Sequence, residues 1–396
     1  MSPASYLTAP PRVAAPSIAE YSRGLHDSPR EPHMKLGVEA ALVGSEFVPG
    51  DLEIVDGRIA GYGLRASNGR GLAVPGFLDL QVNGFVGVDF LGADADGYRR
   101  AGEALLETGV TSYLPTFITA PEEQLVAALH SVPSVLDGPR ILGVHLEGPF
   151  LSPLRLGIHP ETARRDPDES LLERLLAAGP VRLVTLAPEL PGAGSLIRNL
   201  LRHEIAISCG HSDATAEEAN TAFDAGAQTV THLFNAMRPF HHRDPGIAGA
   251  ALARDDVVVQ VILDGVHLAP ETAKVVWLAA AGRVALVTDA TAGAGLGDGS
   301  YRLGGVEIEI RDGIARGPGG ALAGSTLTMI DAVRNLHALG ASLEDAVAAA
   351  TEVPARVLGL TWAGRLAVGL PADVVVLTDA LEIERVLLGG TDRIAL

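Results

Sequence analysis

Strand-like apolar runs alternate with helix-like segments along most of the chain, and this alternation constrains the fold more than any other feature. Each run is apolar on both faces, which is typical of a parallel sheet covered by helices. Eight such units in a row favour a closed (β/α)8 barrel over an open sheet. The strands are expected at 72–82, 110–118, 140–146, 181–186, 205–209, 228–231, 257–263 and 284–288, with helices for example at 95–108, 121–129, 169–178, 216–225 and 270–280 and closing helices at 329–339 and 343–351.

Short strands and turns at both ends of the chain predict a small β domain that the two ends build together. Asp56 and Gly57 stand between two apolar runs, and this pair favours a hairpin because both central turn residues must tolerate positive φ. Neither end is long enough to bury a core alone, so a shared β-sandwich is expected. The expected divisions are a loosely ordered tail at 1–35, the β domain at 36–74 and 361–396, and the barrel at 75–360.

Residues 301–323 alternate between apolar and polar positions again, after the eighth predicted strand, and they hold several glycines. This pattern is typical of antiparallel strands joined by tight turns. Two arrangements fit it: a hairpin insertion over the barrel, or a further part of the β domain.

The formal net charge of −18 excludes nucleic acid and anionic membranes as the main partners, because both would be repelled at long range. A locally basic pocket can still bind a small phosphorylated ligand. The single cysteine, Cys209, excludes an internal disulfide. The first 35 residues lack the features of a secretory signal, and no uncharged apolar stretch reaches the ~18 residues that span a bilayer. A soluble, cytoplasmic protein is therefore expected.

Four predicted strands end in a side chain that can bind a metal ion or transfer a proton. These residues are Glu147, His211, His232 and Asp289. The active sites of (β/α)8 barrels lie at the carboxyl ends of the strands, so the four side chains are expected to meet. Two imidazoles and a carboxylate suit one divalent ion, with zinc favoured and iron, manganese or cobalt as alternatives, and they leave a position open for water. The pattern predicts a single-metal hydrolase site.

The chain resembles the N-acetylglucosamine-6-phosphate deacetylases of the amidohydrolase superfamily from about residue 74 to residue 372. The resemblance rests on long motifs in the family's order. They include His145-Leu-Glu-Gly-Pro-Phe, Gly210-His-Ser-Asp-Ala-Thr and Thr231-His-Leu-Phe-Asn-Ala-Met, and others lie at 75–84, 264–267, 287–291 and 323–329.

The resemblance implies that Glu147, His211 and His232 bind the metal and that Asp289 is the general base and then the general acid. It also implies that His159 helps the metal to polarise the acetamide carbonyl. Most members of the superfamily carry His-x-His on the first strand for a second metal, whereas this chain has Gln81 and Asn83 at those positions. Amides are poorer ligands than imidazoles, so one metal is expected, and the two amides would orient the bound water or satisfy buried backbone groups.

For the phosphate, Arg243 offers a bidentate fork and His267 a further donor. The resemblance implies that both reach the active site of a neighbouring subunit, so a homodimer is expected. A lysine that the family often has before Gly157 is missing, because Arg155 and Leu156 stand there. The remaining expected substrate contacts are Gly148, Ile158, Asn235, Ala236, Asp264, Leu322, Ala323 and Gly324.

Two further residues near these motifs are expected to have structural roles. His145 is expected to face away from the metal, and Cys209 to pack in the core.

The expected reaction is hydrolysis of N-acetylglucosamine 6-phosphate to glucosamine 6-phosphate and acetate. One alternative is an amidohydrolase acting on an unphosphorylated acyl-amino compound, for which Arg243 would have little to do. Another is a catalytically silent barrel that senses sugar phosphates or serves as a scaffold. The silent barrel predicts loss of a metal ligand or of the base, and all four residues are present.

Overall fold

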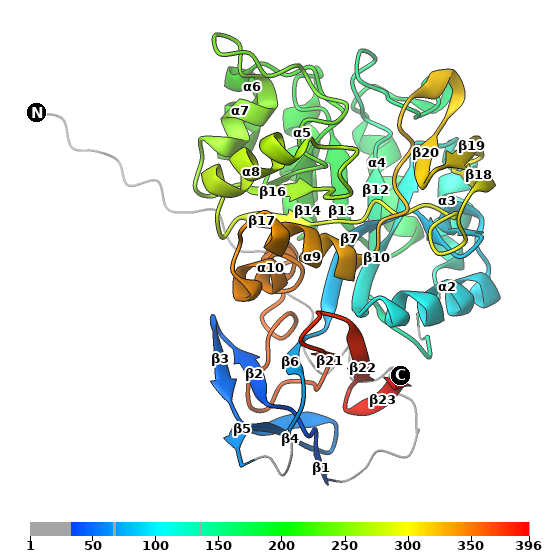
Figure 1. Cartoon of the computed structure of the whole chain (residues 1–396). Coiled ribbons are helices and arrows are strands. Elements are labelled where there is room, and N and C mark those ends of the chain that lie inside the picture. The colour runs from blue at the N-terminus through cyan, green and yellow to red at the C-terminus, as the bar shows by residue number, and fades with distance from the viewer. Residues whose placement is uncertain (1–32, 66–68, 135, 396) are drawn as a thin grey trace, which may run out of the picture.

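A computed structural model describes residues 33–65, 69–134 and 136–395 of the chain, and its centre is a barrel of parallel strands (Figure 1). Neighbouring barrel strands follow the order of the sequence, and the ends of the sheet meet through a parallel bridge between Val82 and Ala290. The prediction of a (β/α)8 barrel is confirmed. The barrel strands are β7 (Phe77–Val82), β10 (Val110–Ile118), β12 (Val144–Glu147), β13 (Val181–Leu186), β14 (Ala206–Cys209), β15 (Thr229–Val230), β16 (Val258–Val261) and β17 (Val284–Leu286).

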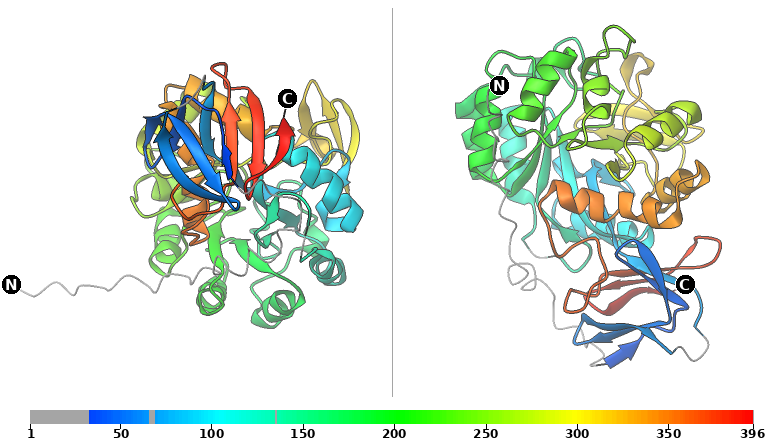
Figure 2. Two further views of the ribbon diagram at one scale, coloured as in Figure 1. Left: turned by 90° about the horizontal axis from the view of Figure 1, so that it is seen from below. Right: turned by 90° about the vertical axis from the view of Figure 1, so that its left-hand side faces the viewer.

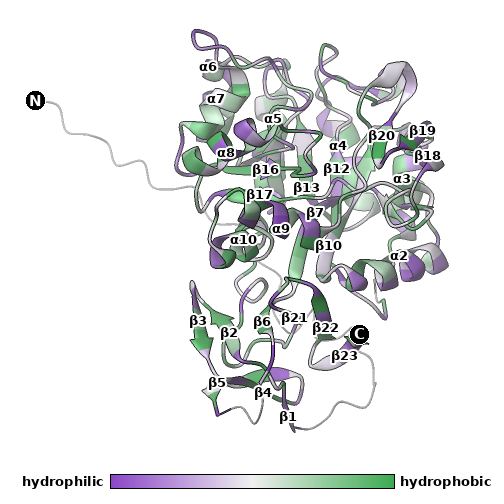
Figure 3. Ribbon diagram, in the orientation of Figure 1, coloured by the Kyte–Doolittle hydropathy of each residue, from purple (hydrophilic) through white to green (hydrophobic). Residues whose placement is uncertain are grey.

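Helices surround the barrel, and their apolar faces pack on the outward side chains of the strands. Several begin at a side-chain cap: Thr215 forms a capping box with Glu218 at the start of α6. Apolar residues predominate along strands such as β10, whereas α2 carries many hydrophilic residues (Figure 3). The helices are α2 (Ala95–Glu107), α3 (Glu122–Ser131), α4 (Glu169–Ala178), α5 (Ala193–Arg202), α6 (Ala216–Asp224), α7 (Gly246–Leu252), α8 (Pro270–Ala279), α9 (Met329–Ala338), α10 (Leu343–Ala349) and α11 (Glu352–Val357).

Two of the predicted strands are each split at a glycine. The run at 72–82 forms β6 (Leu72–Pro75) in the β domain and then β7 in the barrel. Gly76 stands between them, and a Cβ there would lie 2.2 Å from Thr111 Oγ1. The run at 140–146 forms β11 (Arg140–Ile141) and β12, separated at Gly143, which has φ +130°. Close approach and unusual backbone conformation explain both breaks, and apolar periodicity does not report either of them.

The two ends of the chain build one small β domain, as predicted; it lies below the barrel in Figure 1 and in front of it in Figure 2 (left). Its sheets are ordered β23-β22-β21-β6-β2-β3 and β1-β4-β5, and they enclose a separate apolar cluster. Asp56 and Gly57 both have positive φ and join β4 to β5, which confirms the hairpin. Besides β6, the strands of this domain are β1 (His33–Lys35), β2 (Ala40–Val43), β3 (Glu46–Pro49), β4 (Asp51–Val55), β5 (Arg58–Leu64), β21 (Val374–Leu377), β22 (Ile383–Leu388) and β23 (Thr391–Ala395).

The tail expected at 1–35 lies outside the described residues except for its last three. His33–Lys35 form β1, which pairs antiparallel with β4, so the expectation of a loose tail is wrong for these three residues. Their pairing partner is distant enough in sequence that the local pattern does not reveal it.

The segment after the eighth barrel strand is an insertion at the mouth of the barrel. It forms β18 (Gly299–Leu303), β19 (Val306–Arg311) and β20 (Ile314–Arg316), which pair only with one another among the described strands (Figure 1). Its apolar side chains cluster with Ile118 at the end of β10. Of the two arrangements that fitted the sequence, the insertion over the barrel is therefore correct.

Among the described residues, no helix combines the length and apolar character needed to cross a bilayer.

Candidate active site

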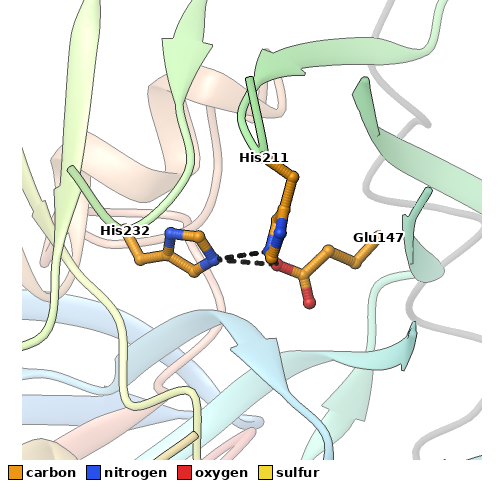
Figure 4. Close-up of side chains that lie close together, drawn as sticks. All are labelled: Glu147, His211 and His232. Atoms are coloured by element: carbon orange, nitrogen blue, oxygen red, sulfur yellow. Dashed lines mark hydrogen bonds and ion pairs between the residues drawn. The ribbon is translucent and has the colours of Figure 1, made fainter. Parts of the chain in front are cut away.

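Three potential metal ligands meet at the carboxyl ends of β12, β14 and β15 (Figure 4). Oε1 of Glu147 lies 3.1 Å from Nε2 of His211 and 3.0 Å from Nε2 of His232. The two Nε2 atoms are 3.1 Å apart. Both histidines have positive φ, an uncommon conformation for residues other than glycine that is concentrated at functional sites.

The donor set suits one divalent cation. Nδ1 of His211 lies 2.9 Å from the carbonyl oxygen of Arg155, which can only accept, so Nδ1 carries the proton. The lone pair of Nε2 is then directed at the site, as in histidines that bind metals. Within the described part of the chain, no second group of such residues converges in this way.

The protonation of the three side chains is also compatible with a metal. Burial lowers the pKa of His211 to about 4, so its ring is neutral at pH 7. Burial alone would raise the pKa of Glu147, but its interactions with the three surrounding histidines hold it well below its ordinary value. Burial opposes the charged form of His232 as well, yet the neighbouring Glu147 raises its pKa overall. A proton on His232 would compete with a cation, so cation binding at this site is linked to loss of that proton.

Asp289 follows β17 and is held by two amides from β7. Oδ1 of Asp289 accepts from Nε2 of Gln81 at 3.0 Å and from Nδ2 of Asn83 at 2.6 Å. Gln81 donates in addition to Oε1 of Glu147 at 3.1 Å. Burial raises the pKa of Asp289 to about 6, and the negative charge of Glu147 acts in the same direction. The amides therefore donate hydrogen bonds to the side chains of Asp289 and Glu147, a role that neither sequence expectation for them included.

His159 lies beside the three ligands with a defined tautomer. Its Nδ1 accepts from the backbone N–H of Thr119 at 3.2 Å, so the proton of the neutral ring is on Nε2. That Nε2 is 3.6 Å from Oε2 of Glu147. An N–H group is therefore directed at the pocket beside the three ligands.

These side chains surround a pocket of about 270 Å³, near the lower end of the roughly 300–1,000 Å³ typical of ligand sites. Sequence analysis missed four of its lining residues. Ile118 stands at a predicted strand end and was detectable there, whereas Leu303 belongs to the insertion. The pocket is lined by twelve of the expected residues: Asn83, Glu147, Ile158, His159, His211, His232, Asn235, Ala236, His267, Asp289, Leu322 and Gly324. Five expected residues do not line it: Gln81, Gly148, Arg243, Asp264 and Ala323. The four lining residues that were not expected are Ile118, Gly157, Leu303 and Ala321.

The two expected phosphate ligands occupy different places. The ring of His267 lines the pocket of its own chain, which corrects the expectation that it reaches a neighbouring site. Asp264 holds it there, because Oδ2 of Asp264 lies 2.7 Å from Nδ1 of His267 and Oδ1 accepts the backbone N–H of the same residue at 2.9 Å. Arg243 is exposed on the loop before α7, and its guanidinium contacts His242 rather than the pocket.

His145 is not among the three potential metal ligands, although it shares a strand face with Glu147. Residues two apart on a strand share a face, and the ring of His145 lies in the barrel interior. Its Nε2 is 2.7 Å from Thr185 Oγ1, and its Nδ1 is 3.3 Å from Thr116 Oγ1. Cys209 is buried in the main apolar cluster, which confirms its packing role.

The fold and the site together define a (β/α)8-barrel hydrolase whose strand ends are arranged to hold a metal ion. The sequence model described as the amidohydrolase family matches residues 72–391, which is most of the chain. The chain belongs to this metal-dependent family and, within it, to the N-acetylglucosamine-6-phosphate deacetylases.

Three comparisons carry this assignment. The human N-acetylglucosamine-6-phosphate deacetylase is 41% identical over 345 residues, 82% of this chain and 84% of that protein. An N-acetylgalactosamine-6-phosphate deacetylase of Escherichia coli O157:H7 is 36% identical over 327 residues, 81% of this chain and 87% of that protein. The structure of an aspartate-to-alanine variant of the Mycobacterium smegmatis deacetylase, in complex with N-acetyl-D-glucosamine-6-phosphate, superposes with a TM-score of 0.87 at 38% identity. The superposition covers 92% of this chain and 100% of the Mycobacterium smegmatis chain.

Proposed function

We propose that the protein hydrolyses the N-acetyl group of N-acetylglucosamine 6-phosphate and releases glucosamine 6-phosphate and acetate. The observation that carries this proposal is the convergence of Glu147, His211 and His232 beside a buried, amide-bound Asp289 in one pocket. A site of this composition provides a position for a cation, a base, and, through His159, a hydrogen-bond donor for the oxyanion. The related deacetylases supply the substrate class.

Each group of residues has a separate role in the proposed reaction. A divalent ion held by the three ligands would act as a Lewis acid and lower the pKa of a water molecule. Because Oδ1 of Asp289 is occupied by Gln81 and Asn83, Oδ2 is the oxygen that accepts the proton of the attacking water. The same oxygen then gives the proton to the amine when the carbon–nitrogen bond breaks. Nε2–H of His159 donates to the carbonyl oxygen as negative charge develops on it.

We propose one zinc ion per chain, with iron, manganese or cobalt as the alternatives. Two imidazoles and one carboxylate are a common set of three protein ligands for catalytic zinc. A second ion next to β7 is disfavoured, because the amide nitrogens of Gln81 and Asn83 are directed at Asp289.

The phosphate is proposed to be bound by His267 of the same chain and by Arg243 of a second chain. His267 already lines the pocket, whereas Arg243 lies outside it on an exposed loop and is free to reach a partner. Several apolar side chains on loops and on α8 are exposed to solvent, and a subunit interface could cover such residues. They include Leu154, Phe240, Val266, Val275 and Leu278.

The sugar ring is proposed to contact Asn235, Ala236, Leu322 and Gly324, which line the pocket beside Asp289. Gly148, Asp264 and Ala323 lie behind this lining, so we propose that they act by positioning it. The cytoplasm is the proposed location, because a charged sugar phosphate does not cross a bilayer unaided.

Release of acetate from four compounds tests the substrate. N-acetylglucosamine 6-phosphate should be hydrolysed faster than N-acetylglucosamine by far more than tenfold, and the 6-phosphates of N-acetylgalactosamine and N-acetylmannosamine rank the preference for the sugar. Equal rates with and without phosphate would contradict the proposal and favour an unphosphorylated acyl-amino substrate. No release from any compound by metal-loaded protein would favour a silent barrel.

Mixing two inactive variants tests the shared site. Arg243→Ala lacks the partner's phosphate ligand in both sites, and Asp289→Asn lacks the base in both. Each mixed dimer regains one complete site, so an equal mixture should recover about a quarter of the parent activity. No recovery after subunit exchange would show that Arg243 does not act across an interface.

A further inference from the structure

The pocket has a distinctly apolar wall on the side of His159. Ile118, Ile158 and Leu303 line it there, and all three belong to one small apolar cluster between β10, the loop after β12 and the insertion. Ile158 precedes His159 directly, and Ile118 precedes Thr119, whose backbone N–H binds the ring of His159. This wall therefore borders the His159 side of the pocket, where the carbonyl oxygen is proposed to bind.

The orientation of an amide in this site follows from the proposed function. The nitrogen must face Asp289 to receive a proton, and the carbonyl oxygen must face His159 and the three ligands. The third substituent of the carbonyl carbon is the acyl chain, which is directed away from Asp289. Of the pocket's lining, the wall of Ile118, Ile158 and Leu303 is the part suited to an apolar group there.

Leu303 is fixed in this wall by the turn that follows it. Gly304 and Gly305 have φ of +56° and +86°, which closes the hairpin between β18 and β19 in two residues. A Cβ on Gly304 would lie 2.3 Å from Cγ1 of Ile118, so the turn rests directly on β10. The backbone N–H of Gly304 also donates to Oδ2 of Asp89 at 2.8 Å. Leu303 and Ile118 are each only 3% exposed, so neither can move aside without opening the cluster.

We propose that Leu303, supported by Ile118, limits the acyl group of the substrate to acetyl. A longer acyl chain would have to displace side chains that are already packed, because the turn cannot retreat from β10. One methylene in an apolar pocket is typically discriminated by about 10–200-fold. The inference rests on the proposed deacetylase activity, which it makes more specific.

The test is the ratio of kcat/KM for N-propionylglucosamine 6-phosphate to kcat/KM for the N-acetyl compound, measured with the metal-loaded protein. Leu303→Ala should raise this ratio at least about tenfold over the parent, and Leu303→Val should raise it less. The ratio does not depend on the fraction of each preparation that is folded. Ile310→Ala is the matched control, because Ile310 belongs to the same cluster but does not line the pocket.

Each outcome decides one point. A raised ratio in both Leu303 variants and a parent-like ratio in Ile310→Ala support the assignment. An unchanged ratio in both Leu303 variants overturns it, and so does an equal rise in Ile310→Ala, which would mean that a loosened insertion is sufficient. If KM for both acyl compounds rises in parallel, the wall contacts the sugar and the proposal is wrong. Failure of the parent protein to release acetate would instead refute the proposed function.

Discussion

Nδ2 of Asn83 lies 2.6 Å from Oδ1 of Asp289, and this contact joins the first barrel strand to the last at the site itself. Asp289 and Gln81 are joined by their backbones as well, through an N–H···O hydrogen bond of 2.9 Å. Asp289, the proposed base, is thus held at the seam where the barrel closes. Its protonation depends on amides at the positions where other members of the superfamily carry metal-binding histidines.

Replacing Asn83 should therefore change the pH dependence of the reaction. A donor to an ionised carboxylate lowers its pKa, so Asn83→Ala should raise the pKa of Asp289. Burial raises that pKa to about 6 in the parent, and the charge of a bound cation lowers it again. The acidic limb of kcat/KM, where the base becomes protonated, is expected below about pH 6 in the parent. In the variant it should move to higher pH.

A profile of kcat/KM between pH 4.5 and 8 measures this shift. Asn220→Ala serves as the control, because the amide of Asn220 contacts Arg254 far from the site and its loss should leave the limb in place. A limb that stays fixed or moves to lower pH in Asn83→Ala would contradict the assigned role of this contact.

Asp289→Asn should lower kcat by a factor of about 10²–10⁴, the usual contribution of a general base. The substitution keeps the size of the side chain and removes only its ability to take a proton. Metal content and thermal stability should remain close to the parent values. A loss of less than about tenfold, which corresponds to under ~1.4 kcal/mol, would mean that another group transfers the proton.

His145 is expected to contribute to stability without binding the metal. Burial lowers its pKa to about 4, so the ring is neutral, and its hydrogen bonds go to threonines of the barrel interior. His145→Ala should lower the unfolding midpoint and keep one metal ion per folded chain. His211→Ala, in contrast, should lose the ion. Loss of metal from folded His145→Ala would contradict this division of roles.

The joint between the barrel and the β domain depends on Arg140. Its guanidinium forms a two-point pair with Asp373 at 3.0 and 2.9 Å, and the two side chains are only 8% and 14% exposed. Arg140→Met leaves that partly buried carboxylate with only the backbone N–H of Gly389 as a donor, so a loss of about 3 kcal/mol in unfolding free energy is expected, the lower end for a buried pair. A urea titration measures it, with Arg311→Met, which breaks an exposed pair, as the control. Equal midpoints in the two variants would contradict the assigned contribution.

The sequence was sufficient to predict the barrel and the four strand ends that form its site. Glu147 and Asp289 are local signals of this kind, because each lies next to an apolar run and barrel geometry brings such ends together. The role of Gln81 was not predictable, since it depends on a contact with Asp289, which lies 208 residues further along the chain. Leu303 was missed for a related reason: no local pattern shows which way the insertion folds over Ile118. The breaks at Gly76 and Gly143 also depend on close tertiary neighbours.

Glu147, His211 and His232 are proposed to hold together one ion that the reaction requires. The most direct measurement is metal content and acetate release from N-acetylglucosamine 6-phosphate on the same samples, before chelation, after it and after zinc is restored. We expect one ion per chain, loss of both ion and turnover on chelation, and recovery of both together. Undiminished turnover by metal-free protein would contradict the account.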